Sequence, residues 1–157
     1  MEHNIKIVLV SPEIPWNTGA IGRTCVAMNM ELIVVKPCDI DFSSSAVKRS
    51  GLDYWEHVKL TICEDWNDFL QRFKPDLQDL FFHTTKAEKL YFNAPYGKDS
   101  YLIFGSETKG LSSFYHDNYA QNSYKLPMFS EHIRSLNLAN TATAVAMEAF
   151  RKNWTYT

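Results

Sequence analysis

The stretch Lys125-Leu126-Pro127-Met128 and, after five intervening residues, Arg134-Ser135-Leu136-Asn137-Leu138 join the last predicted strand to the last predicted helix. Pro127 ends the strand because proline has no backbone N–H to donate. Ser135 or Asn137 can cap the helix that follows, since both side chains accept hydrogen bonds from backbone N–H groups. An exposed loop and a helix cap explain these three residues, but they give no reason for the rest of the string.

Short apolar segments alternate with helical patterns along the whole chain. The predicted strands cover residues 5–10, 32–35, 57–62, 77–83, 101–104 and 123–126. The predicted helices cover residues 18–29, with Asn17 as N-cap, and residues 43–50, 64–73, 112–119 and 137–152. Such alternation is typical of a parallel sheet with helices on both faces. We therefore expect one α/β domain over residues 1–157.

Composition excludes several classes of protein. Of the 157 residues 45% are hydrophobic, which is typical of a globular domain and not of a disordered chain. The sequence shows no bilayer-length apolar run and no signal-peptide pattern, so we expect a cytoplasmic protein without membrane contact. Three widely spaced cysteines and five scattered histidines predict neither a metal site nor disulfides. The net charge of −2 argues against bulk coating of nucleic acid, but not against local recognition.

Two further segments are rich in glycine and polar residues where predicted strands end. In residues 12–23 two prolines precede a helix start that suits an anion, and Arg23 lies one to two turns into that helix beside small residues. In residues 104–111 a strand runs into Gly105, which allows close backbone approach, but the Lys-Ser/Thr pair of a phosphate-binding loop is missing after Gly110. A capped helix and a tight turn explain each segment alone equally well. Ligands of parallel sheets bind at the carboxyl ends of strands, so we expect the site there.

Taken together and in order, these segments resemble the motifs of the SPOUT RNA 2′-O-methyltransferases, in particular the minimal branch that acts on wobble nucleotide 34 of tRNA. The resemblance rests on residues 12–23, Thr84-Thr85-Lys86, residues 104–111, and Leu126-Pro127-Met128 with residues 134–138. Gly51-Leu52-Asp53-Tyr54 is also similar to a segment common in that branch. The loop between Met128 and Arg134 is one residue longer than is typical of it. The motifs span nearly the whole chain.

The resemblance implies a deep trefoil knot in which the C-terminal segment of the chain threads through a loop. It also implies S-adenosylmethionine as cofactor, with S-adenosylhomocysteine as product and no metal. By position, the cofactor would be bound by His83, Gly105, Leu126, Met128, Ser135 and Asn137. Backbone groups would make most of these contacts, so His83 is expected to act neither as base nor as metal ligand.

The resemblance also assigns the chemistry and the partner. Arg23 would be the catalytic residue, and RNA would be bound by Asn17, Arg23, Lys109 and Arg134. Because arginine keeps its proton in proteins, Arg23 would grip the adjacent phosphate or stabilise the developing alkoxide. The partner would be the anticodon stem-loop of tRNA, bound by a homodimer in which Arg23 completes or borders the partner's site.

Three other functions stay open at this point. The chain could methylate another position of tRNA or ribosomal RNA, or it could be an RNA-binding module without activity. A flavodoxin-type nucleotide-binding domain is a further alternative, but Pro12 and Pro15 fit poorly in the Ser/Thr/Gly-rich loop that such a domain needs.

Overall fold

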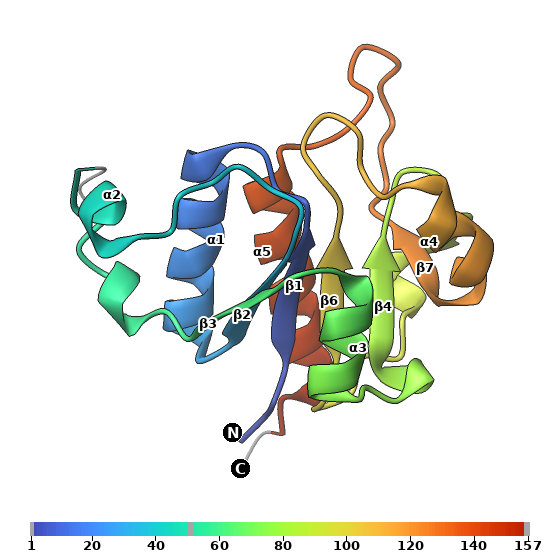
Figure 1. Ribbon diagram of the computed structural model, residues 1–157. Helices are drawn as coiled ribbons and strands as arrows, with labels where there is room; N and C mark the ends of the chain where they lie inside the picture. The colour runs from blue at the N-terminus through green and yellow to red at the C-terminus, as the bar shows by residue number, and fades with distance from the viewer. Residues whose placement is uncertain (1, 50–51, 156–157) are drawn as a thin grey trace.

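The computed structural model describes residues 2–49 and 52–155, and these form a single parallel sheet flanked by helices (Figure 1). Its strands run in the order β3-β2-β1-β6-β4-β7-β5, and every pairing is parallel. The strands are β1 (Lys6–Val10), β2 (Glu31–Val35), β3 (Leu60–Cys63), β4 (Leu80–His83), β5 (Lys89–Leu90), β6 (Tyr101–Phe104) and β7 (Ser123–Lys125). The predicted α/β class is confirmed.

Helices cover both faces of this sheet, as the alternating pattern predicts. They are α1 (Pro15–Met28), α2 (Ser44–Arg49), α3 (Trp66–Phe73), α4 (Ser113–Asn118) and α5 (Leu138–Asn153). In Figure 1, α3 lies in front of the sheet and α5 lies behind it. Within the described residues, no helix has the length and apolarity required to span a bilayer.

Alternate side chains of the central strands enter two separate cores, one on each face. Ile7 and Leu9 of β1 pack with α1 and α5, whereas Val8 and Val10 pack with α3 and α4. Because both faces of a parallel strand are buried, its residues are apolar almost without interruption. Ala142, Ala146 and Ala149 are fully buried, so the small residues of α5 serve close packing within the chain.

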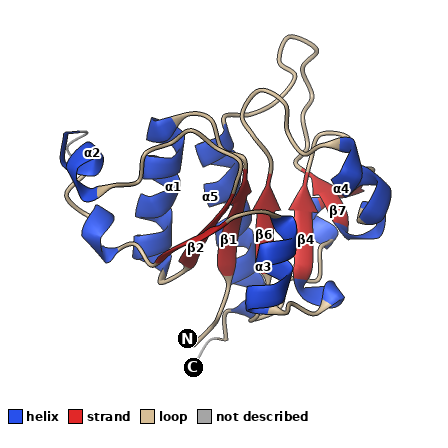
Figure 2. Cartoon of the chain, viewed as in Figure 1, coloured by secondary structure: helices blue, strands red, loops and turns tan. Residues whose placement is uncertain are grey.

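The strand order places three strand ends side by side. The chain passes from β3 to β4, which leaves a gap beside β1 that β6 later fills, and β7 then inserts between β4 and β5. His83 at the end of β4 is therefore in register with Phe104 of β6 and Tyr124 of β7. Figure 2 shows long loops rising above the arrowheads at this edge. Such a reversal of strand order is where parallel sheets bind ligands.

Several predicted boundaries are wrong by one turn. Helix α1 begins at Pro15 with Ile14 as N-cap and no side-chain cap, so Asn17 lies inside the first turn and is not the cap. Pro15 at the first helical position has no N–H, so the helix start has one fewer backbone donor without a partner. The strand expected at 57–62 begins only at Leu60, because His57 belongs to a 3₁₀ turn at 55–57, and the first three residues of the strand expected at 77–83 form a second 3₁₀ turn. Strand β5 was not predicted at all. The expected end of the second helix at residues 50–51 lies outside the described residues.

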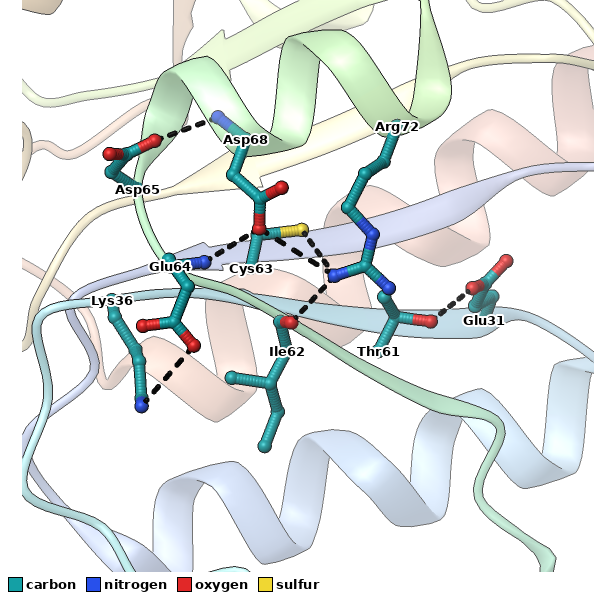
Figure 3. Close-up of polar contacts among 9 residues, drawn as sticks. All are labelled: Glu31, Lys36, Thr61, Ile62, Cys63, Glu64, Asp65, Asp68 and Arg72. Atoms are coloured by element: carbon teal, nitrogen blue, oxygen red, sulfur yellow. Dashed lines mark hydrogen bonds and ion pairs between the residues drawn. The ribbon is translucent and has the colours of Figure 1, made fainter.

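Along the side of the sheet that β3 forms as its outermost strand, polar contacts tie α3 to β3 (Figure 3). Asp65 caps α3 by accepting a hydrogen bond from the N–H of Asp68 at 2.7 Å. Arg72 donates to the carbonyl of Ile62 at 2.9 Å and lies 3.6 Å from the Asp68 carboxylate. These bonds use backbone groups at a sheet edge and a helix start that would otherwise lack partners. We assign this cluster a structural role.

Candidate active site

A cavity of about 600 Å³ opens at the carboxyl ends of β4, β6 and β7. It is lined by residues 83–86, 104–111 and 134–136, with His116, Leu126, Met128, Leu138 and Thr141. Five of the six predicted cofactor residues, all except Asn137, line this cavity. Lys109 and Arg134, which were predicted to bind RNA, line it as well. The structure therefore brings residues 83–86, residues 104–111 and part of the segment 126–138 into one pocket.

His83 forms part of the pocket floor and is held rigidly. Its ring stacks on Phe104 with 4.7 Å between the centroids. Nδ1 lies 3.1 Å from the carbonyl oxygen of Ile103, and Nε2 lies 2.8 Å from the hydroxyl of Tyr96. Burial lowers the pKa of His83 to about 4, so the ring is neutral, Nδ1 donates to the carbonyl, and Nε2 accepts from Tyr96. A fixed neutral ring with both nitrogens occupied is consistent with a positioning role.

The pocket wall after β6 is a tight turn that only glycine permits. Ser106 and Gly110 pair as an isolated bridge, and Gly110 has a φ of 64°. A Cβ atom at Gly105 would lie 2.1 Å from the carbonyl carbon of Gly110 and 2.3 Å from the nitrogen of Leu111. Gly105 is therefore required because the backbone returns across it.

Two carboxylates connect this wall to the start of α1. Glu107 accepts hydrogen bonds from the N–H groups of Glu13 and Ile14 at 2.7 and 3.1 Å. Glu13 in turn accepts a bond from the hydroxyl of Thr108 at 2.8 Å. Hydrogen bonds from Thr108 and Ser106 lower the pKa of Glu13, which keeps this carboxyl ionised. Sequence reasoning missed this reciprocal contact, because residues 94 positions apart carry no local signal of pairing.

The loop between β7 and α5 projects beyond the carboxyl ends of the strands (Figure 1), and Met128, Arg134 and Ser135 of this loop line the pocket. Phe129 in this loop is 98% exposed, which is unusual for a phenylalanine. Arg134 at the base of the loop lines the pocket. An exposed aromatic residue and a cation thus lie on one loop above a cavity.

Asn137 does not line the pocket, and its side chain links two motifs. Its side chain caps α5 by accepting a bond from the N–H of Asn140 at 3.1 Å, as predicted for this position. Its amide also donates to Oδ1 of Asn17 at 3.1 Å. Asn17 is buried, so in the single chain this residue is committed to a structural contact.

Arg23 lies on an exposed face of α1, outside the pocket lining. Its guanidinium carbon is 5.4 Å from the centre of the Tyr54 ring. The small residues beside it admit a segment of the same chain, since a Cβ atom at Gly19 would lie 2.9 Å from Leu52, and one at Gly22 would lie 2.6 Å from Trp55. The open approach expected from these glycines is therefore partly filled by residues 52–55.

Among residues 2–49 and 52–155, no group of three or more histidine, cysteine, aspartate or glutamate side chains is arranged to hold a metal ion. The pocket offers instead apolar side chains, hydroxyls and backbone groups at strand ends. Fold and site together define an α/β protein with a parallel sheet and a ligand pocket at a reversal of strand order.

Comparison with known proteins identifies the family. The profile of the SpoU rRNA Methylase family matches residues 4–148, and the chain belongs to this family. It is 34% identical over 148 residues to a protein of Burkholderia pseudomallei named tRNA (cytidine(34)-2'-O)-methyltransferase, with 94% of each chain covered.

Solved structures agree with this assignment. One, described as giving structural insights into the 2-OH methylation of C/U34 on tRNA, is 34% identical, has a TM-score of 0.86, and shares 97% of this chain and 92% of its own. The AviRb methyltransferase of Streptomyces viridochromogenes, solved in complex with AdoMet, has a TM-score of 0.80 at 22% identity. It covers 97% of this chain and 61% of its own, and it shows the fold alone.

Proposed function

We propose that this protein transfers a methyl group from S-adenosylmethionine to the ribose 2′-OH of wobble nucleotide 34 in tRNA, which is cytidine or a modified uridine. The observation that carries the proposal is the convergence of residues 83–86, 104–111 and 126–136 on one cavity. Membership of the SpoU family supports methyl transfer, and the names of the tRNA relatives support the substrate.

The lining of the pocket fits the cofactor. Leu126, Met128 and Leu138 offer apolar contacts for an adenine ring, and Ser135 and Ser106 offer hydroxyls. Backbone polar groups at Gly105 and His83 lie where strands end, so some of their hydrogen-bonding capacity is free for a ligand. The cofactor would supply an electrophilic methyl group on a sulfonium. In this proposal Asn137 acts indirectly, by fixing the start of α5.

Arg23 is the proposed catalytic residue. A guanidinium remains protonated in proteins, so it is a poor base but a good partner for phosphate or for a developing alkoxide. Holding the ribose hydroxyl in line with the methyl group in a dry site supplies much of the acceleration. The exposed position of Arg23 outside its own pocket supports a site completed by a second subunit.

RNA would approach from the rim. Lys109 and Arg134 are exposed and line the pocket, so they suit the phosphates of an anticodon stem-loop. Asn17 is buried and bonded to Asn137, so it would help to place the nucleotide only indirectly, by fixing the start of α5. Phe129 offers an exposed ring for an unpaired base. Local cations of this kind suffice even though the chain carries a net charge of −2.

The same proposal covers the assembly and the knot. The exposed side chains of Val26 on α1 and Met147 on α5 support a homodimer through these neighbouring helices. The chain leaves β7 beside β4 and returns to α5, which packs with α1 and β6, and this path supports the trefoil knot of a single SPOUT domain over residues 1–157. We place the protein in the cytoplasm, with its tRNA substrate.

The experiment is to map 2′-O-methylation in tRNA from cells with and without this gene. We expect the methyl group at nucleotide 34 to disappear from a subset of tRNAs in the deletion strain. Purified protein should label an anticodon stem-loop in vitro, and the same RNA with a 2′-deoxy nucleotide at position 34 is the matched control. Persistence of the methyl group in the deletion, or equal labelling of the deoxy control, would favour another RNA position.

A further inference from the structure

The segment Leu52-Asp53-Tyr54 lies against the helix that carries Arg23, and the proposed function gives it no role. Leu52 and Tyr54 approach α1 at Gly19, where a Cβ atom would meet Leu52 at 2.9 Å and the Tyr54 hydroxyl at 3.9 Å. Trp55 continues the contact one turn further, at Gly22. The glycines of α1 thus provide the space into which this segment fits.

The position of the Tyr54 ring is fixed at its far end. Its hydroxyl donates a hydrogen bond of 2.8 Å to the carbonyl oxygen of Gly19. Partial burial raises the pKa of Tyr54, so the hydroxyl keeps the proton that this bond requires. The ring is therefore attached to α1 one helical turn before Arg23.

The guanidinium of Arg23 lies over this ring, 5.4 Å from its centre. Among residues 2–49 and 52–155, no carboxylate forms an ion pair with Arg23. A carboxylate would occupy the N–H donors and neutralise the charge that a phosphate must meet. An aromatic face attracts the cation without accepting its N–H bonds, so the donors stay available.

We propose that Tyr54 is the positioning residue for Arg23: its ring restrains the guanidinium, and its hydroxyl bond to Gly19 restrains the ring. This inference rests on the proposed function, because it gives Arg23 the catalytic role. An arginine on an exposed helix face otherwise samples many rotamers, and each rotamer that points elsewhere reduces the fraction of competent enzyme.

The test compares Tyr54→Leu and Tyr54→Phe in steady-state methylation of an anticodon stem-loop. Tyr54→Leu should lower kcat about tenfold, which corresponds to about 1.4 kcal/mol in the barrier, and leave the KM for S-adenosylmethionine unchanged. Tyr54→Phe keeps the ring and should stay within about threefold of the wild type. Val58→Ala is the matched control, because Val58 also packs on α1, at Gly22, but has no aromatic ring, and the substitution should leave kcat unchanged.

A graded series separates ring electronics from packing. Fluorinated phenylalanines at position 54 weaken the negative face of the ring and change its shape little, so kcat should fall stepwise below that of Tyr54→Phe as fluorine atoms are added. A flat series, or an equal loss in Val58→Ala, would overturn the positioning role while Arg23→Ala remains inactive. Full activity of Arg23→Ala would overturn the proposed function and this inference with it.

Discussion

The pocket and the exposed edge, by which we mean Arg23 on α1 and Phe129 on the loop before α5, are held in different ways. Pocket residues such as His83 and Gly105 lie at the ends of buried strands, with both ring nitrogens of His83 bonded and the backbone of Gly105 crossed by its own turn. On the edge, Arg23 rests on one aromatic ring, and Phe129 is 98% exposed. The pocket residues are fixed by the packing and hydrogen bonds of the fold, whereas the two edge residues project from its surface with few contacts.

Because of this difference, we expect mutations at the edge and mutations in the pocket to change different measured quantities. Changes at the edge should alter rate or RNA affinity and leave stability intact, because surface substitutions rarely affect stability by more than about 0.5 kcal/mol. Changes in the pocket should alter stability as well, since they leave buried groups unpaired or crowded.

Arg23→Ala should give the largest effect of all. Loss of one group that stabilises charge in the transition state lowers kcat by about 10³-fold, or about 4 kcal/mol. The free energy of unfolding and the affinity for S-adenosylmethionine should stay close to wild type, because Arg23 is exposed and lies outside the pocket. Steady-state kinetics, urea unfolding and calorimetry measure the three quantities. A folded Arg23→Ala protein with full activity would remove the distinction between edge and pocket.

Gly105→Ala should show the opposite pattern. The new methyl group would lie 2.1 Å from the backbone of Gly110, so the turn must shift. We expect a loss of about 3 kcal/mol in the free energy of unfolding and weaker binding of S-adenosylmethionine. Gly97→Ala is the control, because a Cβ atom there meets nothing within 4 Å. Equal stability of the two variants would show that the pocket wall is as adaptable as the edge.

The sequence predicted the fold well where periodicity is strong. The apolar runs of β1, β2 and β6 and the pattern of α5 lie within about a residue of their expected places. It failed where backbone chemistry changes over a few residues. His57 and Leu77, where two strands were expected to start, lie in 3₁₀ turns, and β5 has only two residues, too few for any period.

The site was predictable as motifs but not as contacts. The ordered segments identify which residues line the pocket, because each follows a strand whose end faces the same edge. Neither the Glu13–Glu107 contact nor the Tyr54 ring beside Arg23 can be predicted from the sequence. The first joins residues 94 positions apart, and the second joins segments about 30 positions apart. Only the similarity of residues 51–54 to the family pattern pointed to Tyr54, and it gave no reason for it.

The pocket should also respond to pH through His83. Burial lowers the pKa of His83 from an ordinary 6.5 to about 4, so the unfolded chain takes up this proton before the folded protein does. The stabilisation is complete above about pH 6.5 and is lost as pH falls toward 4, by up to about 3 kcal/mol. Urea unfolding at pH 7.5, 5.5 and 4.5 measures the loss. His83→Gln cannot titrate and should give a shallower dependence; an identical slope would show that other groups dominate.

Phe129→Ala should give the smallest effect and the cleanest separation of the two regions. A ring that is 98% exposed contributes almost nothing to folding, so the free energy of unfolding should not change. If the ring stacks on an unpaired base, its loss should raise the KM for the stem-loop about tenfold, since such stacking contributes about 1–3 kcal/mol. Phe129→Trp should preserve binding. Leu77→Ala is the control, because Leu77 is 60% exposed but precedes β4 at the opposite end of the sheet. An unchanged KM in Phe129→Ala would confine RNA recognition to the cations at the rim, Lys109 and Arg134.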